Sequence, residues 1–139
     1  MTKGLLRVLI ADDDEAIRNL NAMLVPNAFP EYEVRVDCVS DGIELYERAK
    51  KKEYDLGITD INMPYMTGPI AIRKLRAEGI NFRTLVITGL TDDKNLRETD
   101  ELGLSYLAKP YSPNAFMKAL QSVWAKPSFT PIEGYDFMI

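Results

Sequence analysis

The sequence predicts an α/β domain with five parallel strands and five helices, on the basis of two patterns. Short runs rich in valine, isoleucine and leucine recur along the chain, and stretches with apolar residues at helical spacing lie between them. Near-continuous apolar runs of this length are typical of strands buried on both faces, as in a parallel sheet. Their strict alternation with helices favours right-handed crossover connections. At 139 residues, the chain has the length of a single domain.

Five segments are expected to form the strands, because each is short and largely apolar. They are Leu6–Ala11, Tyr32–Val39, Asp55–Thr59, Thr84–Thr88 and Ser105–Ala108. The first is interrupted by Arg7 and is too short and too charged for a membrane span or a signal peptide. We therefore expect no association with a membrane.

The helices are predicted from capping residues and from apolar residues three and four apart. Pro26 is expected to end the first helix, and Asp41 with Glu44 to cap the second. Pro69 suits the first turn of the third helix, and Ser112 is expected to cap the last. The side chains expected to face inward are Ile17, Leu20, Met23 and Leu24 in the first helix, Ile43, Tyr46 and Ala49 in the second, Ile72 and Leu75 in the third, and Phe116, Ala119, Leu120, Val123 and Trp124 in the last.

Composition narrows the chemistry that this chain can perform. It contains no histidine, which excludes Ser-His-Asp and Cys-His triads and histidine-bound zinc. A single cysteine, Cys38, excludes an intramolecular disulfide and suggests a reducing compartment, so we expect a cytoplasmic protein. With 17 basic and 21 acidic residues the net charge is −4, and direct binding of nucleic acid by this chain is not expected.

Polar residues stand at the carboxyl ends of four expected strands. Asp12 and Asp13 follow the first strand, and Asp60 follows the third. Thr88 ends the fourth strand and Lys109 follows the fifth. Functional groups of an open parallel sheet gather at this edge, so these side chains are expected to meet. Three carboxylates in one place repel one another unless a cation joins them, and such oxygen ligands suit Mg²⁺.

Without histidine, the chemistry left to this site is that of carboxylates, hydroxyls and lysine. A carboxylate can attack phosphorus to give an acyl phosphate, and phosphoryl transfer mainly requires alignment and neutralisation of charge. Asp60 is the best candidate for the nucleophile, because it ends a central strand. Mg²⁺ and Lys109 would supply positive charge, and the Thr88 hydroxyl could hydrogen-bond one phosphoryl oxygen.

Four motifs carry a resemblance to a known family. In chain order they are LRVLIADDDEAIR at the start, LGITDINMPYMTG around Asp60, LVITG around Thr88 and SYLAKPYSP around Lys109. Together they resemble the receiver domain of two-component response regulators, from residue 6 to about residue 125. The resemblance implies a flavodoxin-like (βα)5 fold with strand order 2-1-3-4-5. It also implies a receiver domain over residues 1–126 and a C-terminal tail, residues 127–139, that forms no separate domain.

The resemblance assigns a role to each acidic residue of the expected site. Asp60 would accept the phosphoryl group. Mg²⁺ would bind Asp13, Asp60 and the backbone carbonyl of Asn62, and Asp12 would contribute through a bridging water. The cofactor implied is therefore Mg²⁺ alone.

The resemblance also implies groups that hold the phosphoryl moiety and respond to it. Thr88, Lys109 and Gly89 would contact the phosphoryl group, and the Lys109–Pro110 peptide bond is expected to be cis. Thr88 moving toward the phosphate would let the Tyr106 ring turn inward as a switch. An ordinary strand aromatic is the alternative reading of Tyr106.

Partners follow from the same resemblance. The phosphoryl donor would be a histidine kinase or a histidine phosphotransfer protein, and the donor histidine must come from outside a chain that has none. The fourth helix, Asp92–Leu102, has few apolar residues and is expected to pack lightly and to shift, forming an output face with the fifth strand and the last helix. The output protein is not identified, and homodimerisation stays open. The apolar Leu90 cannot position an attacking water, so a long-lived acyl phosphate is expected.

Three alternative functions compete with this one. A phosphatase of the haloacid-dehalogenase type would need Asp-x-Asp-x-Thr/Val after the first strand, but Ala16 stands two residues after Asp14. A flavin mononucleotide carrier would not place four consecutive acids where the phosphate binds. A degenerate receiver that acts only as a docking module would not need an intact set of site residues. We therefore expect a signalling phosphoacceptor rather than an enzyme, with only self-phosphorylation and autodephosphorylation.

Overall fold

A single parallel sheet organises the computed structural model, which describes residues 3–89 and 93–126. Its strands are β1 (Gly4–Ala11), β2 (Tyr32–Val39), β3 (Leu56–Asp60), β4 (Arg83–Thr88) and β5 (Ser105–Ala108). Their spatial order is β2-β1-β3-β4-β5, and every neighbouring pair is parallel. The flavodoxin-like α/β fold and its strand order are thereby confirmed. The expected tail, residues 127–139, lies outside the described residues.

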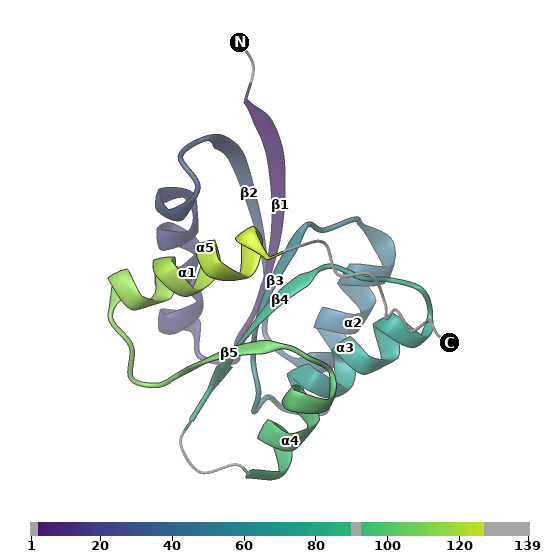
Figure 1. Cartoon of the computed structure of the whole chain (residues 1–139). Helices are drawn as coiled ribbons and strands as arrows, with labels where there is room; N and C mark the ends of the chain where they lie inside the picture. Colours follow the sequence, from purple (N-terminus) through teal and green to yellow (C-terminus); the bar gives the residue numbers. More distant parts are fainter. Residues whose placement is uncertain (1–2, 90–92, 127–139) are drawn as a thin grey trace.

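The helices cover both faces of this sheet. They are α1 (Glu15–Ala28), α2 (Gly42–Lys51), α3 (Gly68–Ala77), α4 (Asp93–Glu101) and α5 (Pro113–Ala125). Helices α1 and α5 lie on one face and α2, α3 and α4 on the other (Figure 1). Each face has its own apolar core, one centred on Phe116 and Ile58 and the other on Leu9 and Leu75. None of the helices in the described ranges is long and apolar enough to span a membrane.

Helix α1 differs from the prediction in which side chains it buries. Leu20 is 48% exposed and Met23 is 73% exposed, whereas Asn21, Val25 and Ala28 are buried. The buried face of α1 includes the polar Asn21. The prediction used only the spacing of apolar residues and therefore identified a neighbouring face of the helix.

The end of α1 is a second correction. Pro26 does not stop the helix but lies within its last turn, and the helix continues to Ala28. Ala28 and Phe29 are each 2% exposed, so the apolar core holds this turn in place. The Phe29 N–H donates to the Pro26 carbonyl at 3.2 Å and closes the helix.

Helix α2 has the predicted cap but a shifted apolar face. The Glu44 N–H donates to Asp41 Oδ1 at 2.8 Å, and the Glu44 carboxylate accepts from the Ser40 N–H at 2.8 Å. Ile43 is 43% exposed, whereas Leu45 and Ala49, four residues apart, are buried. The inward faces of α3 and α5 agree with the prediction, with Ile72, Leu75, Phe116, Leu120 and Val123 all buried.

Candidate functional site

Three carboxylates meet at the carboxyl edge of the sheet. Asp12 and Asp13 follow β1 and Asp60 ends the adjacent β3, because the parallel register that pairs Ala11 with Thr59 brings the two strand ends together. Each of the three carboxylates has one oxygen that lies within 4.8 Å of an oxygen of both others. Asp12 and Asp60 are buried, at 2% and 5% exposure, and Asp13 is exposed. The structure thus gathers the three acids that the sequence placed here.

Backbone contacts hold Asp12 in position. Its Oδ1 accepts a hydrogen bond from the Asp14 N–H at 2.9 Å, and its own N–H donates to the Val39 carbonyl at 3.1 Å. The Arg18 guanidinium donates to the Asp12 carbonyl at 2.7 Å. Burial raises the pKa of Asp12, the Asp14 N–H offsets part of that rise, and the charge of Asp60 adds to it. A buried carboxylate beside other carboxylates is therefore stabilised by an added cation.

Lys109 supplies the positive charge of the site. Its Nζ donates to Asp60 Oδ2 at 2.9 Å, and its backbone N–H donates to the Thr88 carbonyl at 2.7 Å. Burial lowers the pKa of Lys109, but the hydrogen bond to Asp60 and the charges of Asp60 and Asp12 outweigh burial and raise it. The ammonium is therefore charged at neutral pH. The Lys109–Pro110 peptide bond is cis, as expected.

The loop after β3 lies close to the strand that it follows. The Asn62 N–H donates to Asp60 Oδ1 at 3.3 Å, and the Gly68 N–H donates to the Ile61 carbonyl at 3.2 Å. A Cβ at Gly68 would lie 2.5 Å from the Asp60 carbonyl oxygen and 2.5 Å from Thr59 Oγ1. Only glycine permits this approach, which returns the chain to the start of α3 beside the carboxylates.

The remaining predicted residues lie at the same edge or on β5. Thr88 is 2% exposed, and its hydroxyl donates to the Gly89 carbonyl at 2.7 Å. Tyr106, on β5, is 49% exposed. Leu90, whose apolar side chain is the reason that we expect a long-lived acyl phosphate, lies outside the described residues.

One partly buried pair near the site was not predicted. Asn21 of α1 is 1% exposed, and its Nδ2 lies 3.0 Å from the hydroxyl of Tyr111, which follows the cis Lys109–Pro110 bond. The Tyr111 hydroxyl also lies 3.2 Å from Asn21 Oδ1. The only sign of this pair in the sequence was a polar residue, Asn21, among the regularly spaced apolar residues of the first helix. The pair connects α1 to the loop that carries Lys109.

The donor set fits a hard divalent cation. Asp12, Asp13 and Asp60 offer carboxylate oxygens, which suit Mg²⁺, and Lys109 is the ammonium that pairs with Asp60. The three carboxylates outnumber the Lys109 ammonium that pairs with Asp60, and a divalent ion would offset negative charge in the cluster. The acidic cluster is therefore typical of a magnesium site.

Fold and site together define a signalling module of the receiver class. The family profile described as Response regulator receiver domain matches residues 8–121. The chain belongs to this family, which is a family of signalling modules.

Individual relatives support the assignment. The chain is 31% identical over 119 residues to Regulatory protein VanRB of Enterococcus faecalis, covering 85% of this chain and 52% of that protein. It is 32% identical over 108 residues to Transcriptional regulatory protein TctD of Salmonella typhimurium, covering 76% and 46%. The chemotaxis response regulator CheY4 of Vibrio cholerae has a similar structure, with a TM-score of 0.74, 31% identity and coverage of 86% and 98%. The chain spans about half the length of the curated relatives it matches.

Proposed function

We propose that this chain accepts a phosphoryl group on Asp60 and transmits the change through protein contacts. The observation that carries the proposal is the pairing of a buried Asp60 with Lys109 at 2.9 Å inside a cluster of three carboxylates. A carboxylate so placed has a cation beside it to neutralise an incoming phosphate. On this proposal, residues 1–126 form the receiver.

The proposed reaction is a phosphoryl transfer. A carboxylate oxygen of Asp60 forms a bond to phosphorus while the phosphorus–nitrogen bond of a phosphohistidine on a kinase or phosphotransfer protein breaks. The bond electrons stay on the leaving imidazole, which takes up a proton from solvent. Mg²⁺, held by Asp13, Asp60 and the Asn62 carbonyl and by Asp12 through a bridging water, would neutralise charge on the phosphoryl oxygens. Lys109 contributes a second positive charge.

The proposed response uses Thr88, Gly89 and Tyr106. The Thr88 hydroxyl donates to the Gly89 carbonyl in this structure, and a phosphoryl group on Asp60 offers it a charged acceptor instead. The half-exposed Tyr106 ring would then turn inward and change the surface formed by α4, β5 and α5. Helix α4 is suited to such a shift, because Leu96 of the helix and Leu102, which directly follows it, are only partly buried. The output partner would recognise that surface.

Intact-mass measurement tests the proposal. The protein is incubated with Mg²⁺ and a small acyl phosphate or phosphoramidate, and we expect a single phosphate adduct in the wild type and none in Asp60→Asn. Asp14→Asn is the matched control, because Asp14 is a neighbouring acid outside the cluster, and it should keep the adduct. An adduct that persists in Asp60→Asn contradicts the proposal, and absence of any adduct in the wild type favours a degenerate docking module.

A further inference from the structure

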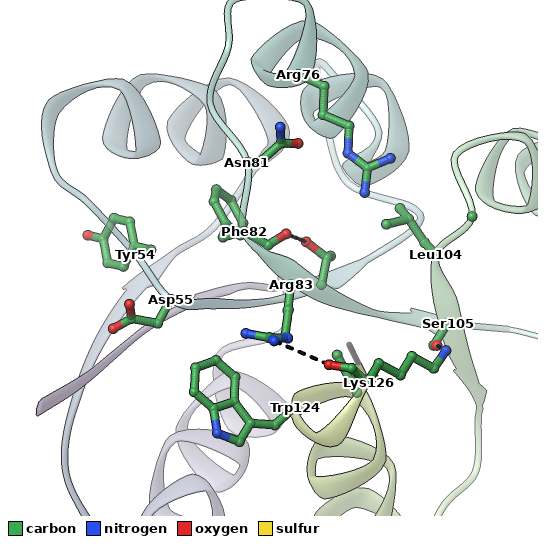
Figure 2. Close-up of a pocket in the computed structure, with 13 residues that line it drawn as sticks. Tyr54, Asp55, Arg76, Asn81, Phe82, Arg83, Leu104, Ser105, Trp124 and Lys126 are labelled. Atoms are coloured by element: carbon green, nitrogen blue, oxygen red, sulfur yellow. Dashed lines mark hydrogen bonds between the residues drawn. The ribbon is translucent and has the colours of Figure 1, made fainter. Parts of the chain in front are cut away.

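A pocket of about 350 Å³ lies at the opposite edge of the sheet, where β3, β4 and β5 begin. Its walls come from several parts of the fold that are distant in the sequence (Figure 2). Arg76 reaches in from α3, Arg83 from the start of β4, and Trp124 and Lys126 from the end of α5. No predicted site residue lines this pocket.

The charged groups of the pocket are mostly cationic. Arg76, Arg83 and Lys126 face it together with one acid, Asp55. Asp55 already interacts with Arg7, whose backbone N–H donates to Asp55 Oδ2 at 2.8 Å and whose Nε lies 3.7 Å from the same oxygen. Three basic residues and one acidic residue thus line the pocket, so its described lining is rich in basic side chains, although the whole chain has a net charge of −4.

Contacts with neighbouring residues hold Arg83 and Arg76 in place. The Arg83 guanidinium lies 4.5 Å from the centre of the Trp124 ring and donates to the Lys126 carbonyl at 3.2 Å. Arg76 donates to the Leu102 carbonyl at 2.6 Å, and burial lowers its pKa. Phe82, like Trp124, adds an aromatic wall. A ligand that combines negative charge with large apolar side chains would complement such a pocket.

The chain itself contains a segment of this chemistry. Residues 127–139, PSFTPIEGYDFMI, lie outside the described residues and follow Lys126, which lines the pocket. The segment contains Glu133 and Asp136 and has no lysine or arginine. Its large apolar residues are Phe129, Ile132, Tyr135, Phe137, Met138 and Ile139. Thirteen extended residues can reach roughly 40 Å, which far exceeds the size of the pocket.

We propose that residues 127–139 bind in this pocket, with their acidic side chains against its cations and their apolar side chains against its aromatic walls. Attachment at Lys126 makes the contact intramolecular. A short connection gives an effective concentration on the order of millimolar, so a contact too weak to capture a separate peptide still forms within the chain.

Fluorescence of Trp124 tests the proposal, because it is the only tryptophan in the sequence and lines the pocket. Acrylamide quenching is measured on the full chain and on the double variant Glu133→Lys, Asp136→Lys. We expect the quenching constant of the double variant to rise about twofold as the ring loses its cover. The control Glu15→Lys, Glu47→Lys changes the net charge equally at two exposed positions outside the pocket and should match the wild type.

Equal quenching in the double variant and the wild type would overturn the proposal. So would protection of Trp124 that appears only at high protein concentration, because that result assigns the occupant to a second copy. A second measurement uses Cys38→Ser, Gly134→Cys carrying a nitroxide label. The indole N–H signal of Trp124 is expected to broaden selectively, and an unbroadened signal contradicts the proposal.

Discussion

Replacing Asp13 by asparagine is expected to stabilise the metal-free protein. Asp13, Asp12 and Asp60 can place oxygens within 4.8 Å of one another, and Lys109 lies beside Asp60. Two unit charges at that distance repel by roughly 1 kcal/mol in bulk water and about 3.5 kcal/mol at an effective dielectric constant of 20. Asp13 is exposed, so the lower figure applies to each of its two neighbours, and attraction to Lys109 cancels part of it. We therefore expect a net gain of about 1 kcal/mol.

Urea unfolding in EDTA at low ionic strength measures this gain. The control is Glu15→Gln, which removes a charge from the first turn of α1 outside the cluster. Because an acid near a helix N-terminus is favourable, the control should lose a few tenths of a kcal/mol, roughly. The two substitutions thus have opposite expected signs.

Two additions extend the test. Added NaCl should shrink the gain of Asp13→Asn by screening the exposed charge. Added Mg²⁺ should stabilise the wild type more than the variant, because the variant lacks one carboxylate ligand. A variant no more stable than the wild type in EDTA would refute the electrostatic reasoning, and equal stabilisation by Mg²⁺ would remove Asp13 from the metal site.

Three further predictions concern the fold. Phe116→Ala, at a side chain that is fully buried, should lower the free energy of unfolding by about 3–5 kcal/mol, measured by denaturant unfolding. Gly42→Ala should lower it by about 1–3 kcal/mol in the same assay, because the new Cβ would lie 1.9 Å from the Met66 carbonyl oxygen and the backbone must move. Burial, with the hydrogen bond to Asp37, raises the pKa of Tyr54 from 10.0 to about 12. The phenol of Tyr54 therefore loses its proton at lower pH in the unfolded chain than in the folded one, so stability falls as pH rises from 10.0 through about 12. In Tyr54→Phe this fall, measured by denaturant unfolding at a series of pH values, should be smaller.

Each of these predictions has a contrasting control. Met23→Ala, at a side chain 73% exposed, should change stability far less than Phe116→Ala. Apart from Gly89 and its chain neighbours, no atom of the described residues lies within 4 Å of a Cβ built at Gly89, so Gly89→Ala should be tolerated where Gly42→Ala is not. If Tyr54→Phe and the wild type lost stability in parallel between pH 10 and 12, Tyr54 would not be the group responsible.

The strands and the carboxylate cluster were predictable because local patterns determine them. A run buried on both faces, such as Leu56–Asp60, is largely apolar up to its polar carboxyl end, and parallel strands bring their carboxyl ends to one edge. The buried face of α1 was not predictable in this way. Asn21 is buried because Tyr111, ninety residues later, satisfies its amide, and no local pattern contains that partner.

The basic pocket escaped prediction for a related reason. Its cations come from α3, β4 and the end of α5, and each one alone is an ordinary surface charge. Arg76 and Arg83 are seven residues apart in the sequence and belong to different elements, so only the folded chain brings them together with Lys126. The predicted site residues all lie at or near the carboxyl ends of the strands, whereas this pocket lies where β3, β4 and β5 begin.

The hydrogen-bonded pair of the buried Asn21 and the partly buried Tyr111 has a consequence for sequence variation. Each side chain is the other's partner, so replacing either one alone leaves a polar group in an apolar interface, at a cost of about 1–3 kcal/mol. Replacing both by apolar residues of similar shape removes that cost. Positions 21 and 111 are therefore expected to change together among related sequences. A chimaera that takes α1 from one relative and the β5–α5 loop from another should be stable only when both halves carry the matching pair.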